Sequence, residues 1–357
     1  MTATGSASGP VEFTDAEGRT QSLDAAWEAD EPWPPGSPVR VRRLRLAARW
    51  AGVDADGATG LLQKRVVPST ARNVDWAPYD ALDREISIGL HLVRGCAAAG
   101  RPYPAELSRL VGYDVDAEEP FVLYLPYRGQ PVSRFVGRLL LREQRVFETG
   151  VFKALGLLAA MGVTHRAIGP DTVLWDKETL QVQAVDFSSA VLSGTKHVQA
   201  VRAAWLHEQD AASSDPRVDV WSAGALAFYS ATGRRLGPGD DPVAEPALQS
   251  SRLAAQLSRI LSPSIEKRPT AAAVLHSIGY PDPWPEPNRT ATAADELFAE
   301  GGRRFDVRFP PAGDRLSGIG TGAGIGNGTG ATVPGKPVVT APAAKRPRHW
   351  WSRREGS

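Results

Sequence analysis

The sequence predicts an α+β fold, with a strand-rich first part and a helix-rich second part. Three strand candidates, at 39–46, 47–53 and 61–67, follow one another closely, and the first alternates apolar residues with arginine. Apolar residues then recur at helical spacing on one face of 80–94. The 357 residues suffice for one large two-lobed domain with tails, or for two domains.

Residues 1–38 are expected to form an N-terminal extension. Residues 1–10 are small and polar and are expected to be disordered. A short strand and turn are predicted at 11–19, and a helical piece at 23–27. Four prolines in 31–38 exclude regular structure there, because proline fixes φ and lacks an amide donor.

The remaining elements are predicted from apolar periodicity and turn residues. The strand at 47–53 ends at Asp54–Gly57, a hairpin signal. The other predicted strands lie at 107–113, 121–125, 173–175 and 182–185. The predicted helices lie at 80–94, 133–141, 143–161, 219–231, 253–261 and 270–278, the last capped by Thr270, with one further helix at 291–304.

Composition narrows the class of protein. The net charge is +1, which argues against a dedicated polyanion binder. Cys96 is the only cysteine, so no disulfide can form within the chain, which fits a reducing cytosol and a cytoplasmic location. No apolar run approaches the ~20 residues of a membrane helix. Abundant Ala, Gly, Arg and Pro with scarce Lys suggest a high-GC bacterial genome.

The chain is organised around the stretch from Met161 to Ala190. His165-Arg166-Ala167 precedes two short apolar strands joined by a turn, and Asp186-Phe187-Ser188 follows them. This arrangement resembles the catalytic loop (H-R-D-L-x-x-x-N) and the metal-binding loop (D-F-G) of eukaryotic-type Ser/Thr protein kinases. The chain resembles a degenerate bacterial, pseudokinase-like member of that family.

Two later stretches strengthen the resemblance. Asp219-Val220-Trp221-Ser222-Ala223-Gly224 resembles the family's D-x-W-S-x-G helix, and Arg268-Pro269-Thr270 resembles the start of its final helix. The resemblance implies a two-lobed protein-kinase-like fold. It consists of a β-rich N-lobe at 39–125, a helical C-lobe at 126–280, and a tail at 281–357. It also implies that Asp219 accepts amides of the catalytic loop and that Glu208 pairs with Arg268.

Several parts needed for phosphoryl transfer are replaced. The position of the catalytic carboxylate holds Ala167, whose methyl group cannot orient a hydroxyl. The second metal ligand is Thr172, and the usual lysine two residues after the base is Gly169. No G-x-G-x-x-G occurs between Val39 and Val53, so backbone amides cannot cradle phosphates there.

Three residues keep nucleotide binding open. The resemblance makes Lys64 the strand lysine, Glu85 its helix partner and Asp186 the magnesium ligand. The alternatives are an ordinary strand lysine and a loop carboxylate that accepts backbone amides. Leu62 would crowd an adenine ring beside Lys64, so binding of ATP and Mg²⁺ is expected to be weak or absent.

The function predicted from the resemblance is that of a catalytically inactive pseudokinase, acting as a binding, scaffolding or regulatory module. The alternative is an ATP-dependent Ser/Thr kinase, or a related nucleotide-dependent transferase, with non-standard catalytic residues. His165 and Phe187 are expected to be core residues, and Arg166 is expected to be structural.

The C-terminal tail offers a separate candidate contact. Residues 318–342 are rich in Gly, Thr, Ala and Pro and predict a flexible linker. The chain then ends in a basic, tryptophan-containing segment that predicts contact with an anionic surface or a protein partner, or else forms a solvated tail. Its residues are Lys345, Arg346, Arg348, Trp350, Trp351, Arg353 and Arg354.

Overall fold

A computed structural model describes residues 7–27, 31–32, 38–50, 58–68, 75–196, 198–199, 204–237, 240–245, 248, 251–281 and 283. Four regions for which predictions were made lie outside these residues. They are the hairpin turn at 54–57, the helix at 291–304, the linker at 318–342 and the basic tail.

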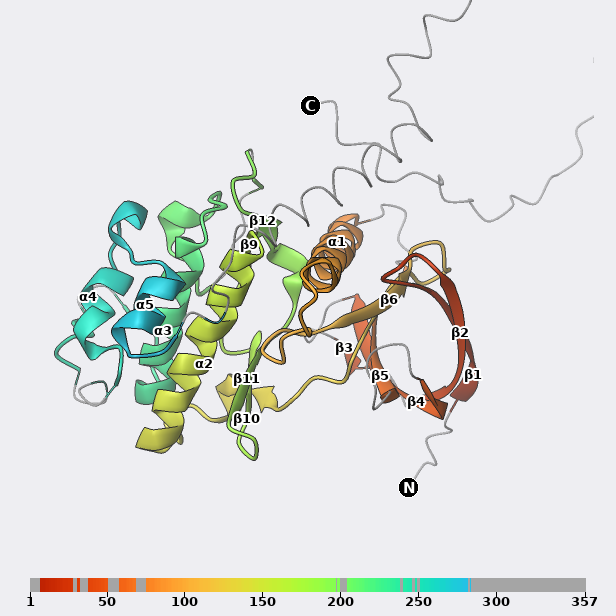
Figure 1. The fold of residues 1–357 in the computed structure, drawn as a ribbon, viewed down its shortest axis with the longest axis horizontal. Coiled ribbons are helices and arrows are strands. Elements are labelled where there is room, and N and C mark those ends of the chain that lie inside the picture. Colours follow the sequence, from red (N-terminus) through yellow and green to blue (C-terminus); the bar gives the residue numbers. More distant parts are fainter. Residues whose placement is uncertain are drawn as a thin grey trace, which may run out of the picture. The chain divides into compact units, whose positions relative to one another are not determined.

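The first part of the chain forms a closed antiparallel barrel of six strands (Figure 1). The order around the ring is β2-β1-β6-β7-β5-β4, and pairing of β2 with β4 closes it. The strands are β1 (Ala7–Asp15), β2 (Thr20–Trp27), β4 (Val39–Trp50), β5 (Ala58–Val66), β6 (Leu110–Asp114) and β7 (Phe121–Tyr124). The short β3 (Glu31–Pro32) adds to the outer edge of β4.

The barrel shows that the predicted fold class is wrong. A two-lobed protein-kinase-like fold was expected to combine a small β-rich N-lobe with a helical C-lobe. Instead, β1 and β2 come from residues before 39 and complete a closed ring with the strands of 39–125. Among the described residues after 126, only two helices exceed seven residues. Local strand patterns do not reveal closure, because closure depends on pairing between distant strands.

Three element predictions are also corrected. Residues 23–27 are strand and not helix, because their side chains alternate between the barrel interior and solvent. The predicted strands at 39–46 and 47–53 belong to one strand, β4, as far as Trp50, with a shift in its register against β5 between Arg45 and Trp50; residues 51–53 lie outside the described residues. At 133–140 the structure has only the 3-10 turn η1 (Val132–Arg134), a further turn and irregular chain, and the next helix begins at Leu141.

A glycine permits one of the closing contacts. β1 pairs with β6 only at Thr14↔Tyr113 and Asp15↔Gly112. A Cβ at Gly112 would lie 2.2 Å from the Phe13 ring and 2.7 Å from the Thr14 carbonyl oxygen, so any side chain would separate the two strands there.

The helices and the remaining strands follow the barrel strands in sequence, apart from α1, which lies between β5 and β6. Their bounds are α1 (Ala77–Ala98), α2 (Leu141–Ala160), α3 (Arg217–Thr232), α4 (Leu257–Ile260) and α5 (Ala271–Ser277). A three-stranded sheet contains β8 (Gln130–Pro131), β10 (Val173–Asp176) and β11 (Gln181–Ala184), and β9 (Val163–Thr164) pairs with β12 (Val191–Leu192). In the described part of the chain, no helix has the length and apolar character required to cross a bilayer.

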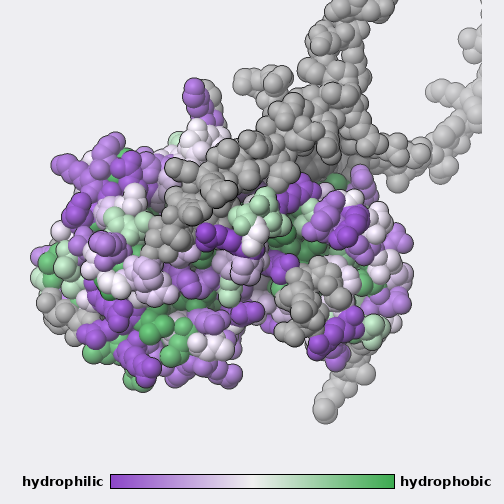
Figure 2. Space-filling view, in the orientation of Figure 1, coloured by the Kyte–Doolittle hydropathy of each residue, from purple (hydrophilic) through white to green (hydrophobic). Residues whose placement is uncertain are grey.

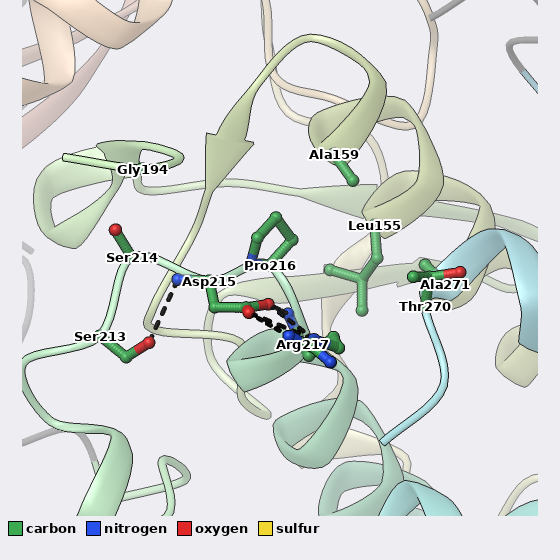
Figure 3. A pocket seen from close by; sticks show the side chains of 10 residues that line it. All are labelled: Leu155, Ala159, Gly194, Ser213, Ser214, Asp215, Pro216, Arg217, Thr270 and Ala271. Carbon is green, nitrogen blue, oxygen red and sulfur yellow. Dashed lines mark hydrogen bonds and ion pairs between the residues drawn. The ribbon is translucent and has the colours of Figure 1, made fainter. Parts of the chain in front are cut away.

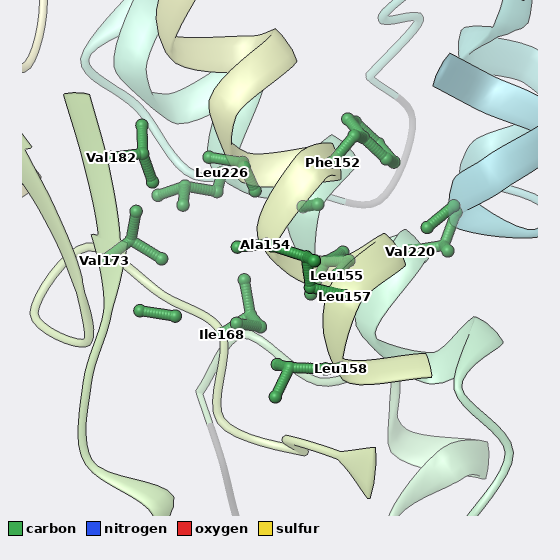
Figure 4. Close-up of a cluster of buried hydrophobic side chains, with 14 of the residues drawn as sticks. Phe152, Ala154, Leu155, Leu157, Leu158, Ile168, Val173, Val182, Val220 and Leu226 are labelled. Atoms are coloured by element: carbon green, nitrogen blue, oxygen red, sulfur yellow. The ribbon is translucent and has the colours of Figure 1, made fainter. Parts of the chain in front are cut away.

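Two hydrophobic cores hold these parts together. The barrel interior is filled by apolar residues on alternate strand positions, such as Leu44, Leu61 and Leu123. A larger core lies around α2, where Phe152, Leu155 and Leu158 pack against apolar residues of β10, β11 and α3 (Figure 4). On the face shown in Figure 2, hydrophilic residues predominate and apolar ones form small separate patches.

Candidate functional site

The candidate site begins with an ion pair between the barrel and α1. Lys64 lies on β5, a strand hydrogen-bonded on both sides by β4 and β7. Its ammonium nitrogen is 2.5 Å from Glu85 Oε2 on α1, and the Glu85 side chain is fully buried. The contact expected between these two residues is therefore present, because strand and helix place the two side chains at one interface.

Asp186 joins the same ammonium from a distant part of the sequence. Its Oδ1 lies 3.0 Å from Lys64 Nζ and also accepts the Ser188 amide. Its backbone is left-handed, with φ of 66°, at the start of the 3-10 turn η2 (Phe187–Ser189). Arg84 on α1 donates to the Ser188 carbonyl at 2.8 Å, so α1 holds this turn directly as well as through Lys64. We call Lys64, Glu85 and Asp186 the Lys64 cluster.

Opposing effects set the charges in the Lys64 cluster. Burial disfavours the Lys64 ammonium, but the two carboxylates outweigh burial and raise its pKa. Burial also raises the pKa of Glu85, against the opposing effect of Lys64. Burial would raise the pKa of Asp186, yet Lys64 and the Ser188 amide lower it to about 2. Two carboxylates thus share one cation, which leaves the cluster short of positive charge.

Two buried polar atoms lie beside this cluster. Glu85 Oε1 and the Tyr124 hydroxyl form no hydrogen bond of standard geometry, but the phenol interacts with the Glu85 carboxylate. The Glu85 charge and burial raise the pKa of Tyr124 well above its usual value, which places the phenol close to the carboxylate. Buried polar groups without well-formed hydrogen bonds carry a desolvation cost, so Glu85 and Tyr124 offset part of the stabilisation that the ion pairs contribute.

The predicted catalytic loop is anchored by Asp219 on α3. Asp219 accepts the backbone amides of His165 at 2.6 Å and Arg166 at 2.7 Å, the contact expected from the resemblance. His165 packs against Phe187 with ring centroids 5.2 Å apart, and both residues are fully buried. Burial lowers the pKa of His165 to about 4, so this imidazole is neutral and belongs to the core.

Arg166 is structural in this arrangement. Its φ is 65°, and its Nη2 donates to the carbonyls of Gln199 and Ala211 at 2.8 and 2.6 Å. The guanidinium therefore ties the loop to the segment before α3 and does not point to a free ligand site.

Trp205 fills the space beside Gly169. A Cβ at Gly169 would lie 2.7 Å from Trp205 Cδ1, so a lysine cannot replace Gly169 while the indole stays there. Trp205 also contacts the Tyr229 ring at 4.8 Å and lies under the Arg235 guanidinium. Trp205 was not predicted from the sequence, because only tertiary packing brings it to the loop.

The donor set does not fit a magnesium ion. Asp186 is already bound to Lys64, and the Thr172 hydroxyl is used within its own loop, donating to the Ala167 carbonyl at 2.6 Å and accepting the Gly169 amide. No cluster of three His, Cys, Asp or Glu side chains suited to a metal occurs among the described residues. The expectation about ATP and Mg²⁺ itself stays a prediction.

The second predicted ion pair has a different acidic partner. Arg268 binds Asp210 at 2.5 Å, whereas Glu208 is exposed at the first residue of the 3-10 turn η3 (Glu208–Asp210). Glu208 was predicted as the partner because it stands at the matching distance before Asp219. One turn carries both acids, so sequence distance alone could not decide which of them points inward.

A separate groove of about 530 Å³ lies between α2, the start of α3 and the start of α5 (Figure 3). Its polar groups are engaged with one another: Asp215 binds Arg217 through both oxygens and receives a hydrogen bond from that residue's amide, while its own amide donates to Ser213. These contacts leave the groove without a described polar side chain that needs a ligand.

No model of a known protein family matches this chain.

Proposed function

We propose that this protein is a non-catalytic binding or scaffolding module, in which the Lys64 cluster serves as an internal brace. The observation that carries the proposal is the double engagement of Lys64. Its side chain is 7% exposed and its ammonium is held by Glu85 and Asp186. A lysine in these contacts must lose a carboxylate before it can bind a phosphate, which is costly for a buried charge.

The loop beside the cluster supports the same proposal. Ala167 offers no group that accepts a proton or orients a hydroxyl. Thr172 is used within its loop, and Trp205 stands against Gly169. Parts that act as a unit in catalysis lose most of their effect when one is missing, so several missing parts leave little rate enhancement.

The direct test is a radiolabelled-ATP assay of the full chain with a generic protein substrate. We expect no phosphate incorporation by the wild type or by Ala167→Asp, because restoring one carboxylate leaves Thr172 and Trp205 as they are. Incorporation by the wild type that disappears in Asp186→Ala would overturn the proposal. Circular dichroism of each variant checks that folding is retained.

One observation favours a nucleotide-dependent phosphotransferase as the second candidate. The Asp186 side chain is 19% exposed although its Oδ1 contacts Lys64, so the side chain remains partly open to solvent. Titration with ATP, with and without Mg²⁺, separates the two candidates through the melting temperature. A ligand that binds only the folded state stabilises it by RT ln(1 + [L]/Kd), so millimolar Mg-ATP should hardly change the melting temperature of a non-binder.

Partner binding through the C-terminal end is the other part of the proposal. The segment from Lys345 to Arg354 combines cations with two adjacent tryptophans, which suits an anionic surface or an acidic protein. We expect deletion of 313–357 to leave the melting temperature unchanged and to weaken association with anionic vesicles, mainly at low salt. Equal vesicle binding by both proteins would remove this part of the proposal.

A further inference from the structure

The start of α2 departs from two local rules of helix formation. Leu140 stands at the N-cap, where Ser, Thr, Asp or Asn would accept an amide of the first turn, and its side chain makes no capping hydrogen bond. Arg142 follows in the first turn, where the positive end of the helix dipole favours acidic side chains. Glu143 follows the rule, because its Oε2 accepts the Leu140 amide at 2.8 Å. Departures from local rules are expected at functional surfaces.

Two leucines are exposed at this point of the fold. Leu140 is 67% exposed and Leu141 is 50% exposed, the two highest values among the large apolar side chains described. They are adjacent in sequence and therefore form one apolar patch. Because apolar area in water is unfavourable, the pair gains free energy when another apolar surface covers it.

Arginines flank the two leucines. Arg134, Arg138 and Arg142 are exposed, and the stretch from 134 to 142 contains no acidic residue. Arg138 and Arg142 form no ion pair with a described residue, and Arg134 donates to Gln130 Oε1 at 3.4 Å. The surface thus combines apolar side chains with uncompensated cations. We call it the Leu140 patch, and it consists of Leu140, Leu141, Arg134, Arg138 and Arg142.

The acids that adjoin the Leu140 patch are engaged. Glu143 is buried, and beyond its bond to the Leu140 amide its Oε1 lies 3.9 Å from the Lys177 ammonium. Asp171 accepts the Ser133 hydroxyl at 2.9 Å. The arginines therefore keep their charge available for an anionic partner.

The N-cap of α1 has the same exposure with the opposite charge. Trp76 is an apolar N-cap without a capping hydrogen bond and is 47% exposed. Its neighbours Asp75 and Asp80 are acidic. An anionic surface would repel the flanks of Trp76 and attract those of Leu140, so charge distinguishes these two exposed N-caps.

We propose that the Leu140 patch binds the anionic surface of a lipid bilayer. The leucines would enter the boundary between headgroups and acyl chains, and the arginines would lie at the lipid phosphates. A bilayer fits this patch better than an acidic protein does, because two leucines offer far less than the ~800 Å² that each partner buries in a stable protein interface. The patch is separate in sequence from the C-terminal segment and adds a contact to the one proposed for it.

Sedimentation of the full chain with phosphatidylcholine vesicles, with and without phosphatidylserine, tests the proposal. Leu140→Ser/Leu141→Gln should bind the phosphatidylserine vesicles at least ~10-fold more weakly than the wild type. Serine is a favoured N-cap, so the melting temperature should not fall, which separates a surface role from a structural one. Trp76→Ser is the matched control and should bind as the wild type does. Equal vesicle binding by the wild type and the double variant would overturn the proposal.

Salt distinguishes the two kinds of contact. Arg138→Gln/Arg142→Gln should weaken binding at least ~10-fold at low salt, because each arginine near an anionic bilayer contributes to affinity, and should have little effect at high salt. The effect of the leucine variant should persist at high salt, since apolar burial is not screened. Unchanged binding of the arginine variant at low salt would contradict the proposal.

A fluorophore separates the Leu140 patch from the C-terminal segment, which is proposed to bind the same vesicles. An environment-sensitive dye attached to Leu140→Cys should shift to shorter wavelength on phosphatidylserine vesicles, whereas the dye on Asp24→Cys, exposed on β2, should not. Cys96 is buried, so labelling is directed to the introduced thiol. Vesicle binding with an unchanged spectrum at position 140 would assign binding to the C-terminal segment and overturn the role of the patch, and no binding at all would overturn both.

Discussion

Lys64 and Arg268 are both buried cations, but their surroundings differ in how completely they are satisfied. Arg268 is held by one carboxylate, that of Asp210, and donates to the carbonyls of Ser262, Pro263 and Arg217. Lys64 has two carboxylates around one ammonium, and the Tyr124 phenol lies beside Glu85 without a hydrogen bond of standard geometry.

The difference indicates that the two sites do different work. A planar guanidinium has five donors in a fixed fork, and in Arg268 the fork joins three segments in one rigid arrangement. An ammonium has three freely rotating donors, and in the Lys64 cluster its single positive charge faces two carboxylates. The Arg268 site joins three segments through one guanidinium, whereas the Lys64 cluster braces β5, α1 and the turn at Asp186 through one ammonium shared by two carboxylates.

Substitution of Arg268 should lower the free energy of unfolding more than the substitutions described below. Arg268→Ala leaves Asp210 buried without a cation and three carbonyls without a donor. We expect the free energy of unfolding to fall by about 3–5 kcal/mol, measured by urea denaturation. Glu208→Ala is the matched control and should change the stability by less than about 0.5 kcal/mol. A larger loss of stability in Glu208→Ala than in Arg268→Ala would show that the pairing of Arg268 with Asp210 is wrong.

Substitution of Lys64 should have a smaller effect. Lys64→Met leaves Glu85 uncompensated, but Asp186 is partly exposed and Glu85 can take up a proton. We therefore expect the free energy of unfolding to fall by about 3 kcal/mol, the lower end of the range for a broken buried ion pair. The deficit should shrink at acidic pH, where the carboxylates are neutral. The double variant Lys64→Met/Glu85→Gln should recover part of the loss, and a purely additive double-mutant cycle would show that the pair is not coupled.

The pH dependence of stability tests the loop that lies between the two sites. His165 has its pKa lowered by burial from 6.5 to about 4. Its contribution to stability is complete above the unfolded pKa and is lost as the pH falls from 6.5 towards 4. From about pH 7.5 to about pH 5, this amounts to about 2 kcal/mol.

The variant His165→Phe isolates this effect. Asp219 acts in the opposite direction, because burial raises its pKa to about 7 and its contribution grows as the pH falls through that range. Urea denaturation of the wild type and the variant at both pH values gives the difference due to His165. An identical pH dependence in the two proteins would mean that His165 titrates normally in the folded state.

The smallest effect concerns the helix cap next to Arg268. The Thr270 hydroxyl accepts the Ala273 amide at 3.1 Å at the start of α5. Thr270→Ala should cost about 1 kcal/mol, and Thr270→Ser should restore most of it. Thermal denaturation of the three proteins measures both changes. A loss of stability as large as that of Arg268→Ala would mean that the Arg268 site depends on α5 more than on the ion pair with Asp210.

Features that depend on near neighbours were predicted from the sequence. The Thr270 cap, the helix that contains 80–94 and the strands around the Asp176 turn follow from residues within one or two turns of each other. The contacts of Lys64 with Glu85 and of Asp219 with the loop amides were expected from motif spacing. The role of Lys64, Glu85 and Asp186 in binding a nucleotide stays a prediction.

Features that depend on distant pairing were not predicted. Residues 23–27 were assigned to a helix, yet they are a barrel strand because β4 hydrogen-bonds to them. Trp205 and Asp210 reach the loop and Arg268 through the path of the chain before α3, which no local pattern specifies.

The sequence by itself determined the alternation of strand residues, the helix face of α1, the cap at Thr270 and the absence of disulfides, because each depends on residue type and short-range spacing. Only the tertiary structure decided that six strands close into a barrel, that Asp210 and not Glu208 meets Arg268, and that Leu140 is exposed at the start of α2. The physical reason is that strand pairing and burial depend on which distant segments exclude water from one another, and many pairings are compatible with the same local pattern.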